Sequence, residues 1–365
     1  MIDFAPTEDQ TAIRDLARQV ATEQFRKHAR AAEEAGEMPT AVRKVLAETG
    51  LLTPFPEDFG GSGVQDAVTH ALITEELAFG DGGLAMNVVG SILAPLAVLV
   101  AGNEDQRKEF LGLFSQDGET PGVGAVGLAE LATGFNLRET SNVLQSLGGS
   151  MWLDVQQRGV VHGINSTLRI VLAKLYNAPD GEGLCLVALP GNLEEWEVTA
   201  EAHPLGLVAA PRARWKLYVE LNSVWVLGGL EQGGPGAARF VALANVLLGA
   251  LAVGIARAAL EYSCDYAKGR IQFGKPISSY QAIAFMAAEM AMDVDAARFL
   301  IWRAAQTWDT GGDALRLAER ARMQAVKTAQ RVTTDAVQIL GGAGFLQDHP
   351  VELWMRDAAA LAALG

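Results

Sequence analysis

The stretch GRIQFGKP, from Gly269 to Pro276, brings together a cation, an amide and an aromatic ring where a helical pattern is interrupted. The pattern reaches Arg270 and resumes beyond Pro276, because a glycine and a proline break it in between. A guanidinium can hold a pyrophosphate through paired hydrogen bonds, and the ring of Phe273 can stack on a planar group. Gln272 adds an amide between them. Taken alone, the stretch is more typical of an ordinary helix break with a salt-bridged arginine.

A second stretch, DAVQILGGAGF, ends a helical pattern in closely spaced glycines. Gly341 and Gly342 can let the backbone approach a ligand, because they carry no side chain. Gln338 offers an amide one turn earlier. A glycine pair is a weak signal and usually marks only the end of a helix. Together with the Arg270 stretch, however, it weakens the interpretation as an ordinary helix break.

The elements that position these stretches fall into three regions. Residues 1–118 show helical patterns, with Thr7 and Asn103 predicted to cap two helices. Residues 119–228 change to short runs with period-two alternation, which predict a small β-domain. Residues 229–365 return to long helices with wide apolar faces, typical of a bundle that continues across subunits. The predicted fold class is α+β, mainly α.

Composition limits the function classes. Of 365 residues, 50% are hydrophobic and only 20% are charged, which indicates oligomer interfaces. A formal net charge of −14 argues against a binder of duplex nucleic acid, which needs clustered Lys and Arg. Cys185 and Cys264 lie far apart, so neither a disulfide framework nor a metal site is expected.

Targeting signals are not evident in the sequence. The acidic start MIDFAPTEDQ lacks the apolar core of a signal peptide, and a cytoplasmic location is expected. The apolar stretch 240–260 is long enough to span a membrane. The amphipathic helices on both sides of it favour a helix buried among other helices, so no transmembrane segment is predicted.

Several motifs, in the same order, resemble those of the acyl-CoA dehydrogenase family of flavoproteins. LLTPFPEDFGGSG, ITEELAFGDGGLA and GNEDQRKEFL are similar to its N-terminal helical domain. GRIQFGKPISSYQAIAFMAAEMAM and AVQILGGAGFLQDHPVELWMRDA are similar to its C-terminal domain, and these two are highly specific. The resemblance spans essentially the whole chain. It implies an N-terminal helical domain, a middle β-barrel-like domain and a C-terminal four-helix bundle.

The resemblance also implies a function. Members of the family bind FAD at a subunit interface, oxidise an acyl-CoA thioester at Cα and Cβ, and pass electrons to an electron-transfer flavoprotein. Six residues are thereby assigned to the diphosphate and adenosine of FAD: Arg270, Gln272, Phe273, Gln338, Gly341 and Gly342. A homotetramer, or a hetero-oligomer with a full-length homologue, is the assembly this implies.

The segments that the resemblance places at the flavin ring depart from the family pattern. GLAELATGFN keeps Glu130 but has Phe135 and Asn136 where Ser and Asp are expected. HGINSTLRI has Thr167 where an aromatic residue is expected and Arg169 where a hydroxyl residue is expected. Glu130 and Thr167 remain as predicted cofactor contacts in a weakened site.

The family's catalytic base has no acidic counterpart. The usual base is the tenth residue counted from the arginine of Arg-Asp-Ala, and this count falls on Gly365. The alternative position falls on Ala244, and the Asp and Arg that hold pantetheine fall on Ala242 and Asn245. A positioned base contributes about 10²–10⁴ in rate, so its loss should be close to disabling. The sequence thus resembles a divergent and C-terminally short member.

Three hypotheses follow. The chain is a dehydrogenase whose base comes from an unexpected position, or a non-catalytic subunit that lends Arg270 and the Gln338 segment to the FAD of a full-length homologue. In the third, it is a flavin-free scaffold or binding protein that keeps only the fold. The survival of the motifs that face a neighbour's cofactor favours the second.

Overall fold

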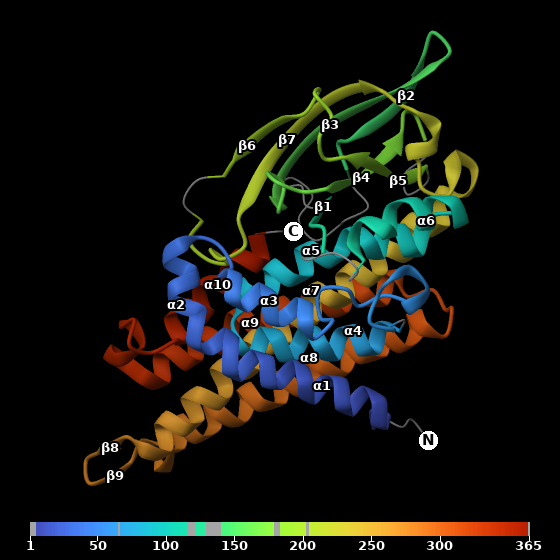
Figure 1. The fold of residues 1–365 in the computed structure, drawn as a ribbon. Helices are drawn as coiled ribbons and strands as arrows, with labels where there is room; N and C mark the ends of the chain where they lie inside the picture. The colour runs from blue at the N-terminus through green and yellow to red at the C-terminus, as the bar shows by residue number, and fades with distance from the viewer. Residues whose placement is uncertain are drawn as a thin grey trace.

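The structure, a computed structural model, describes residues 5–64, 66–115, 121–128, 140–178, 183–201 and 204–363. Long helices make up most of it, and a bent β-sheet covers one side of them (Figure 1). The predicted fold class, with helices before and after a middle sheet, is confirmed. The described strands of that sheet lie between Gly124 and Glu220.

The N-terminal helices are set by clear capping signals. They are α1 (Glu8–Val20), which continues through a π-helical turn (Ala21–Phe25) into α2 (Arg26–Ala35), then α3 (Thr40–Glu48), α4 (Ala67–Gly80), α5 (Gly82–Ala101) and α6 (Glu104–Leu111). Thr7 accepts from the backbone N–H of Gln10 at 3.2 Å, and Asn103 from that of Gln106 at 2.9 Å. Both predicted caps are confirmed, and both form capping boxes.

Two helices form the centre of the molecule. Almost every residue of α5 is buried, as is most of α7 (Gly229–Gly269), which contains the apolar stretch 240–260. Both helices are long and apolar enough to cross a membrane, but 89% of the most apolar part of each is buried inside the protein. The sequence prediction of a helix packed among other helices is therefore correct.

The middle sheet wraps around a core of its own. Its strands are β1 (Gly124–Gly127), β2 (Val143–Leu147), β3 (Ser150–Val161), β4 (Leu168–Leu175), β5 (Leu184–Pro190), β6 (Glu197–Ala200) and β7 (Arg212–Glu220). Their order is β1-β4-β2-β3-β7-β6, and β5 pairs with the other edge of β4. Leu153, Val187 and Trp215 fill the inside of the curved sheet, whereas Ile170 and Leu186 face the helices. This gives the sheet its barrel-like form.

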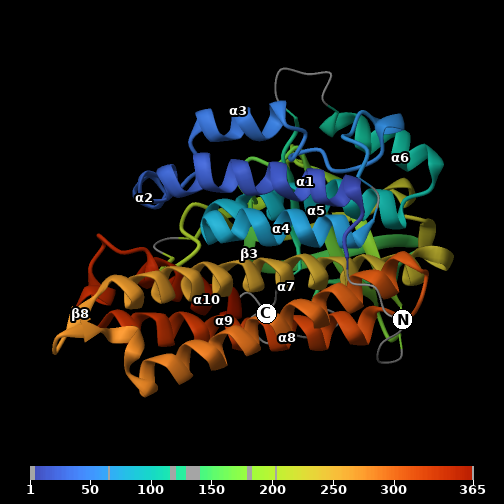
Figure 2. The ribbon, with the colours of Figure 1, turned by 90° about the horizontal axis from the view of Figure 1, so that it is seen from below.

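The C-terminal part is a helical bundle. Helices α7, α8 (Gln281–Asp309) and α9 (Leu315–Leu340) run side by side, and α10 (Val351–Ala363) packs against α7 and α9 (Figure 2). Between α7 and α8 the chain forms a small hairpin of β8 (Ile271–Gln272) and β9 (Lys275–Pro276). The predicted helix break is thus a hairpin that extends from the end of the bundle (Figure 1).

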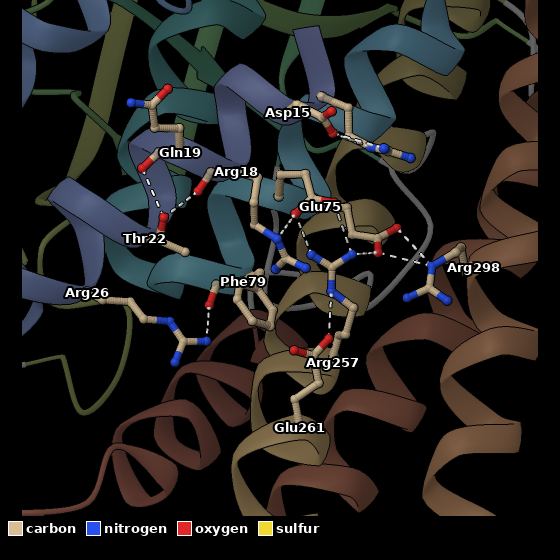
Figure 3. Close-up of polar contacts among 12 residues, drawn as sticks. Asp15, Arg18, Gln19, Thr22, Arg26, Glu75, Phe79, Arg257, Glu261 and Arg298 are labelled. Carbon is tan, nitrogen blue, oxygen red and sulfur yellow. Dashed lines mark hydrogen bonds and ion pairs between the residues drawn. The ribbon is translucent and has the colours of Figure 1, made fainter. Parts of the chain in front are cut away.

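A buried ionic network joins the N-terminal helices to the bundle (Figure 3). Arg257 of α7 donates to Glu75 at 2.7 Å and to Glu76 at 2.5 Å, both on α4. Arg298 of α8 also reaches Glu75, at 3.0 Å. The guanidinium of Arg257 lies 4.7 Å from the ring centre of Phe79. Since these charges are largely removed from water, each depends on its partners.

A loop of the middle domain is held against α10. The backbone N–H of Leu207 donates to Asp357 at 2.6 Å, and Arg356 donates to the carbonyl of Leu205 at 2.7 Å. Between them, Gly206 packs so closely on the backbone of α10 that a Cβ at this position would overlap the carbonyl of Arg356. The loop and the helix therefore touch backbone to backbone.

We expect Gly206→Ala to destabilise the protein by about 1–3 kcal/mol, because the extra methyl group has no space without moving the loop. Gly112→Ala is the matched control, since no atom lies within 4 Å of the added Cβ there. Denaturant titration of both variants measures the difference. Equal unfolding midpoints for the two variants would show that the loop tolerates displacement.

Candidate cofactor and substrate site

The hairpin exposes to solvent the residues that were predicted to contact the adenylate half of FAD. Phe273 is 94% exposed at the hairpin tip, where its φ of 51° is rare for a residue with a side chain. The hairpin is held in place because Tyr280 donates to the carbonyl of Gln272 at 3.0 Å, and Lys275 lies 4.3 Å from the ring centre of Tyr280. Arg270 is exposed and forms no ion pair with any residue that the structure describes.

The end of α9 presents an open backbone. Gln338, Gly341 and Gly342 are exposed, and no atom lies within 4 Å of a Cβ placed on either glycine. Gly341 has a φ of 60°, which favours glycine. The hairpin and this segment lie at the same end of the bundle in both views (Figures 1 and 2). The exposed ring of Phe345 adds an apolar surface beside the glycines.

A small cavity, called the closed cavity below, lies beside the segments assigned to the flavin ring. It measures only about 30 Å³ and lies among α5, β1, β3 and α7, and its lining is apolar: Met86, Gly90, Leu93, Val126, Leu128, Gly159, Val161 and Leu248. That volume is about one water molecule, whereas pockets for small ligands measure about 300–1,000 Å³. The cavity lies where β1 and β3 lead into the segments that the resemblance assigned to flavin. Glu130 of the first segment lies outside the described residues.

Helix α5 closes this region by packing directly on β3. A Cβ on Gly90 would meet Val161 at 2.5 Å, so the two elements approach as closely as a glycine allows. Next to Val161, the Nε2 of His162 lies 2.8 Å from the carbonyl oxygen of Asn87. Burial lowers the pKa of His162 to about 4, which leaves the imidazole neutral at pH 7. His162 is therefore a structural donor to α5.

The α7 positions assigned to substrate and base provide no carboxylate. Ala242 and Ala244 are buried, and Asn245 is fully buried. The amide oxygen of Asn245 accepts from Arg322 of α9 at 3.2 Å. Burial lowers the pKa of Arg322 to about 10, so the guanidinium stays charged at pH 7. Arg322 was not predicted as a site residue. The sequence pattern that could have revealed it is a single arginine on an otherwise apolar face of α9. The usual base position, Gly365, lies outside the described residues.

Thr167 does not line the closed cavity. It borders a second cavity of about 670 Å³ between the edge of the β-domain, including Ser166 and Pro190, and the end of α6, including Phe110. Arg169 points to the inside of the sheet, where its guanidinium lies 4.8 Å from the ring centre of Trp196. The residues of β3 that do line the closed cavity, Gly159 and Val161, were not predicted from the sequence. A β-bulge between Gln157 and Val160 shifts the register there.

The described residues differ in how well they suit the two halves of FAD. The exposed cation, amide and aromatic ring of the hairpin fit the diphosphate and adenine half. The closed cavity itself is too small and too apolar for the isoalloxazine ring, whereas the cavity of about 670 Å³ beside Thr167 is within the size range of small-ligand sites.

Comparison with known proteins is consistent across the chain. Residues 7–116 match the profile of the acyl-CoA dehydrogenase N-terminal domain, and residues 232–365 match that of the C-terminal domain. A probable acyl-CoA dehydrogenase of Bacillus subtilis (strain 168) is 30% identical over 361 residues, covering 98% of this chain and 94% of the relative.

Solved structures share the fold. The butyryl-CoA dehydrogenase of Megasphaera elsdenii superposes with a TM-score of 0.86 at 28% identity, covering 99% of this chain and 95% of the other. A chain solved in a study of the electron transferring flavoprotein of Acidaminococcus fermentans has a TM-score of 0.86 at 29% identity, covering 99% and 94%. By its sequence and by its fold, this chain belongs to the acyl-CoA dehydrogenase family.

Proposed function

We propose that this chain is the non-catalytic subunit of an acyl-CoA dehydrogenase-type hetero-oligomer. In this assembly it supplies Arg270, Gln272, Phe273 and the Gln338 segment to FAD bound mainly by a full-length partner. FAD is the cofactor of the family. The substrate class is an acyl-CoA thioester, and the electron acceptor is an electron-transferring flavoprotein, as the relatives' names suggest.

One contrast carries the proposal. The residues that the family pattern assigns to a neighbouring subunit's cofactor are exposed, whereas the cavity beside the segments for the chain's own flavin ring measures only about 30 Å³. The base position on α7 is Ala244, a buried aliphatic residue without a proton acceptor. In the proposed assembly, the exposed ring of Phe273 at the hairpin tip would contact the partner's cofactor.

The outer face of α8 supports an oligomer. Phe285 and Met292 are 62% and 63% exposed and lie seven residues apart, on the same face of the helix. Seven-residue spacing of large apolar side chains is typical of a helix that packs against another helix. We also propose a cytoplasmic location, which agrees with the free thiols of Cys185 and Cys264.

The experiment compares the chain alone with the chain coexpressed with a full-length family member. We expect no flavin absorbance from the isolated chain and FAD in the complex. Arg270→Ala or Phe273→Ala in this chain should lower the FAD affinity of the complex by about tenfold or more, which corresponds to loss of one charge-assisted or stacking contact. Lys275→Ala is the matched control on the same hairpin, since its ammonium lies over Tyr280.

Other outcomes contradict the proposal. Flavin that copurifies with the isolated chain and bleaches on anaerobic addition of acyl-CoA would identify a complete dehydrogenase with an unexpected base. A stable, flavin-free homo-oligomer that forms no complex with a full-length homologue would support the alternative function, a scaffold or binding protein with the family fold.

A further inference from the structure

We propose that His349 and Tyr262 are positioning residues, which hold the end of α9 at a fixed distance from the hairpin and thereby raise the affinity for FAD. The part they hold is the glycine segment, residues 341–345, and it is followed by the loop 346–350 that leads into α10. The inference rests on the proposed function, because that function assigns the first two glycines of the segment to a partner's FAD. It adds two residues that act through the segment and not on the cofactor itself.

His349 is the point at which the loop after the glycine segment meets α7. Its Nδ1 lies 2.7 Å from the hydroxyl oxygen of Tyr262, and its ring meets that of Tyr266 edge to face at 5.6 Å. Tyr262 and Tyr266 lie one turn apart on the same face of α7. Burial raises the pKa of Tyr262, so its hydroxyl keeps its proton near neutral pH. The imidazole is therefore held by one hydrogen bond and by contact with two aromatic rings.

The same end of α7 leads directly into the hairpin. The backbone N–H of Arg270 donates to the carbonyl of Tyr266 at 2.8 Å, so Tyr266 belongs to the last turn before the hairpin. His349 therefore connects the glycine segment to the helix end that carries Arg270. The hairpin and the glycine segment lie at the same end of the bundle (Figures 1 and 2). Holding two contact segments at the right spacing before a ligand arrives raises the affinity for that ligand.

The loop is anchored from its other side by α2. Arg30 donates to the carbonyl of Gln347 at 3.0 Å and to that of His349 at 3.2 Å. Arg30 is itself held by Glu33 at 2.8 Å and by Glu352 of α10 at 2.5 Å. One guanidinium thus fixes two carbonyls of the loop backbone, while the side chain of His349 joins the same loop to α7. The loop is held between the N-terminal helices and the bundle.

The glycine segment takes its position from its neighbours in the chain. No atom lies within 4 Å of a Cβ placed on Gly341 or Gly342, and glycine has the widest backbone freedom of all residues. The later Gly344 packs against the backbone of Val337 in α9, which fixes the middle of the segment. A displacement of the loop at His349 is therefore transmitted to the exposed glycines.

Two substitutions of the same size test the hydrogen bond in the isolated chain by hydrogen exchange. His349→Leu removes the bond, whereas His349→Asn keeps an oxygen and an N–H near the place of Nδ1 and can pair with Tyr262 in either direction. We expect His349→Leu and Tyr262→Phe to exchange the amides of residues 341–349 about fivefold faster, as for loss of one hydrogen bond. His349→Asn should exchange as the unaltered chain does. Tyr218→Phe, which removes an exposed hydroxyl on β7, is the matched control.

The same variants are then measured in the complex with a full-length homologue, by titration of flavin fluorescence. His349→Leu and Tyr262→Phe should weaken FAD binding about fivefold, and His349→Asn should restore it. Unchanged exchange in His349→Leu would overturn the inference. Faster exchange with unchanged FAD affinity would also overturn it, and the proposed function would stand if Arg270→Ala still weakened binding. A complex of the unaltered chain that binds no FAD would overturn both.

Discussion

Arg257→Ala is expected to lower the free energy of unfolding by about 3–5 kcal/mol, the usual cost of removing one partner from a buried ionic network. The side chains of Glu75 and Glu76 are only 5% and 7% exposed, so water cannot replace the lost guanidinium. Arg298 and Arg18 still reach these carboxylates, at 3.0 and 3.1 Å, which places the loss nearer the lower limit. Chemical denaturation at fixed protein concentration measures it.

The control for this prediction is Arg331→Ala. Arg331 also bridges two acids, Glu289 at 2.5 Å and Asp293 at 2.8 Å, but its side chain is half exposed. Water screens such a pair, so its removal should leave the free energy of unfolding nearly unchanged. If Arg257→Ala were as mild as Arg331→Ala, the network in Figure 3 would contribute little to joining α4 and α7.

Asp357→Asn should stabilise the protein above neutral pH and flatten its pH dependence. Asp81 and Asp357 are both fully buried, and burial raises the pKa of Asp81 to about 6. Burial, together with the charge of Asp81, raises the pKa of Asp357 well above its ordinary value. One carboxylate oxygen of Asp357 has no hydrogen-bond partner among the described residues. Holding two neighbouring carboxylates ionised without water costs free energy.

The direction in which stability changes with pH follows from the number of protons that the folded and unfolded states bind. Because the folded-state pKa values lie above the unfolded ones, the folded protein binds more protons between about pH 4 and 7. The stability contributed by these protons is present below the unfolded pKa and is lost as the pH rises through the folded pKa. Asparagine removes one charge but keeps an oxygen for the N–H of Leu207. Each unit of pKa shift is worth about 1.4 kcal/mol, so a gain on the order of 1–3 kcal/mol is expected at pH 8.

Denaturation midpoints at pH 5 and pH 8 measure this effect. The difference between the unaltered protein and Asp357→Asn should be small at pH 5 and large at pH 8. Asp265→Asn is the control, since Asp265 is exposed and pairs with Lys268 on the surface. Parallel pH profiles for the unaltered protein and Asp357→Asn would show that folding does not shift the pKa of Asp357.

Local features were predictable from the sequence, because short segments determine them. Thr7 and Asn103 cap helices with their own neighbours, and the glycine and proline around Phe273 break the helix whatever surrounds it. The alternation of polar and apolar residues in β7 likewise predicted a strand with one face inside the sheet. These elements required no knowledge of distant contacts.

The closed cavity was not predictable in this way. It depends on the contact of Gly90 with Val161, which lie 71 positions apart in the chain, and on a β-bulge that shifts the register of β3. Thr167 was predicted by aligning HGINSTLRI with a segment of the family that contacts the flavin ring, and in the structure it borders the cavity of about 670 Å³. The burial of Arg322 against Asn245 likewise depends on how α7 and α9 pack.

The central position of α7 affects how the protein can be made in a cell. Helix α4 ends at Gly80 and α5 at Ala101, but the helix against which both pack begins only at Gly229 and ends at Gly269. A ribosome adds about 5–20 residues per second, so roughly 10–30 s pass before α7 is complete. During that time the apolar surface of α5 and the acids of α4 have no partner from α7. We therefore expect newly made chains to need a chaperone that covers this surface more than helix-rich proteins with local contacts do.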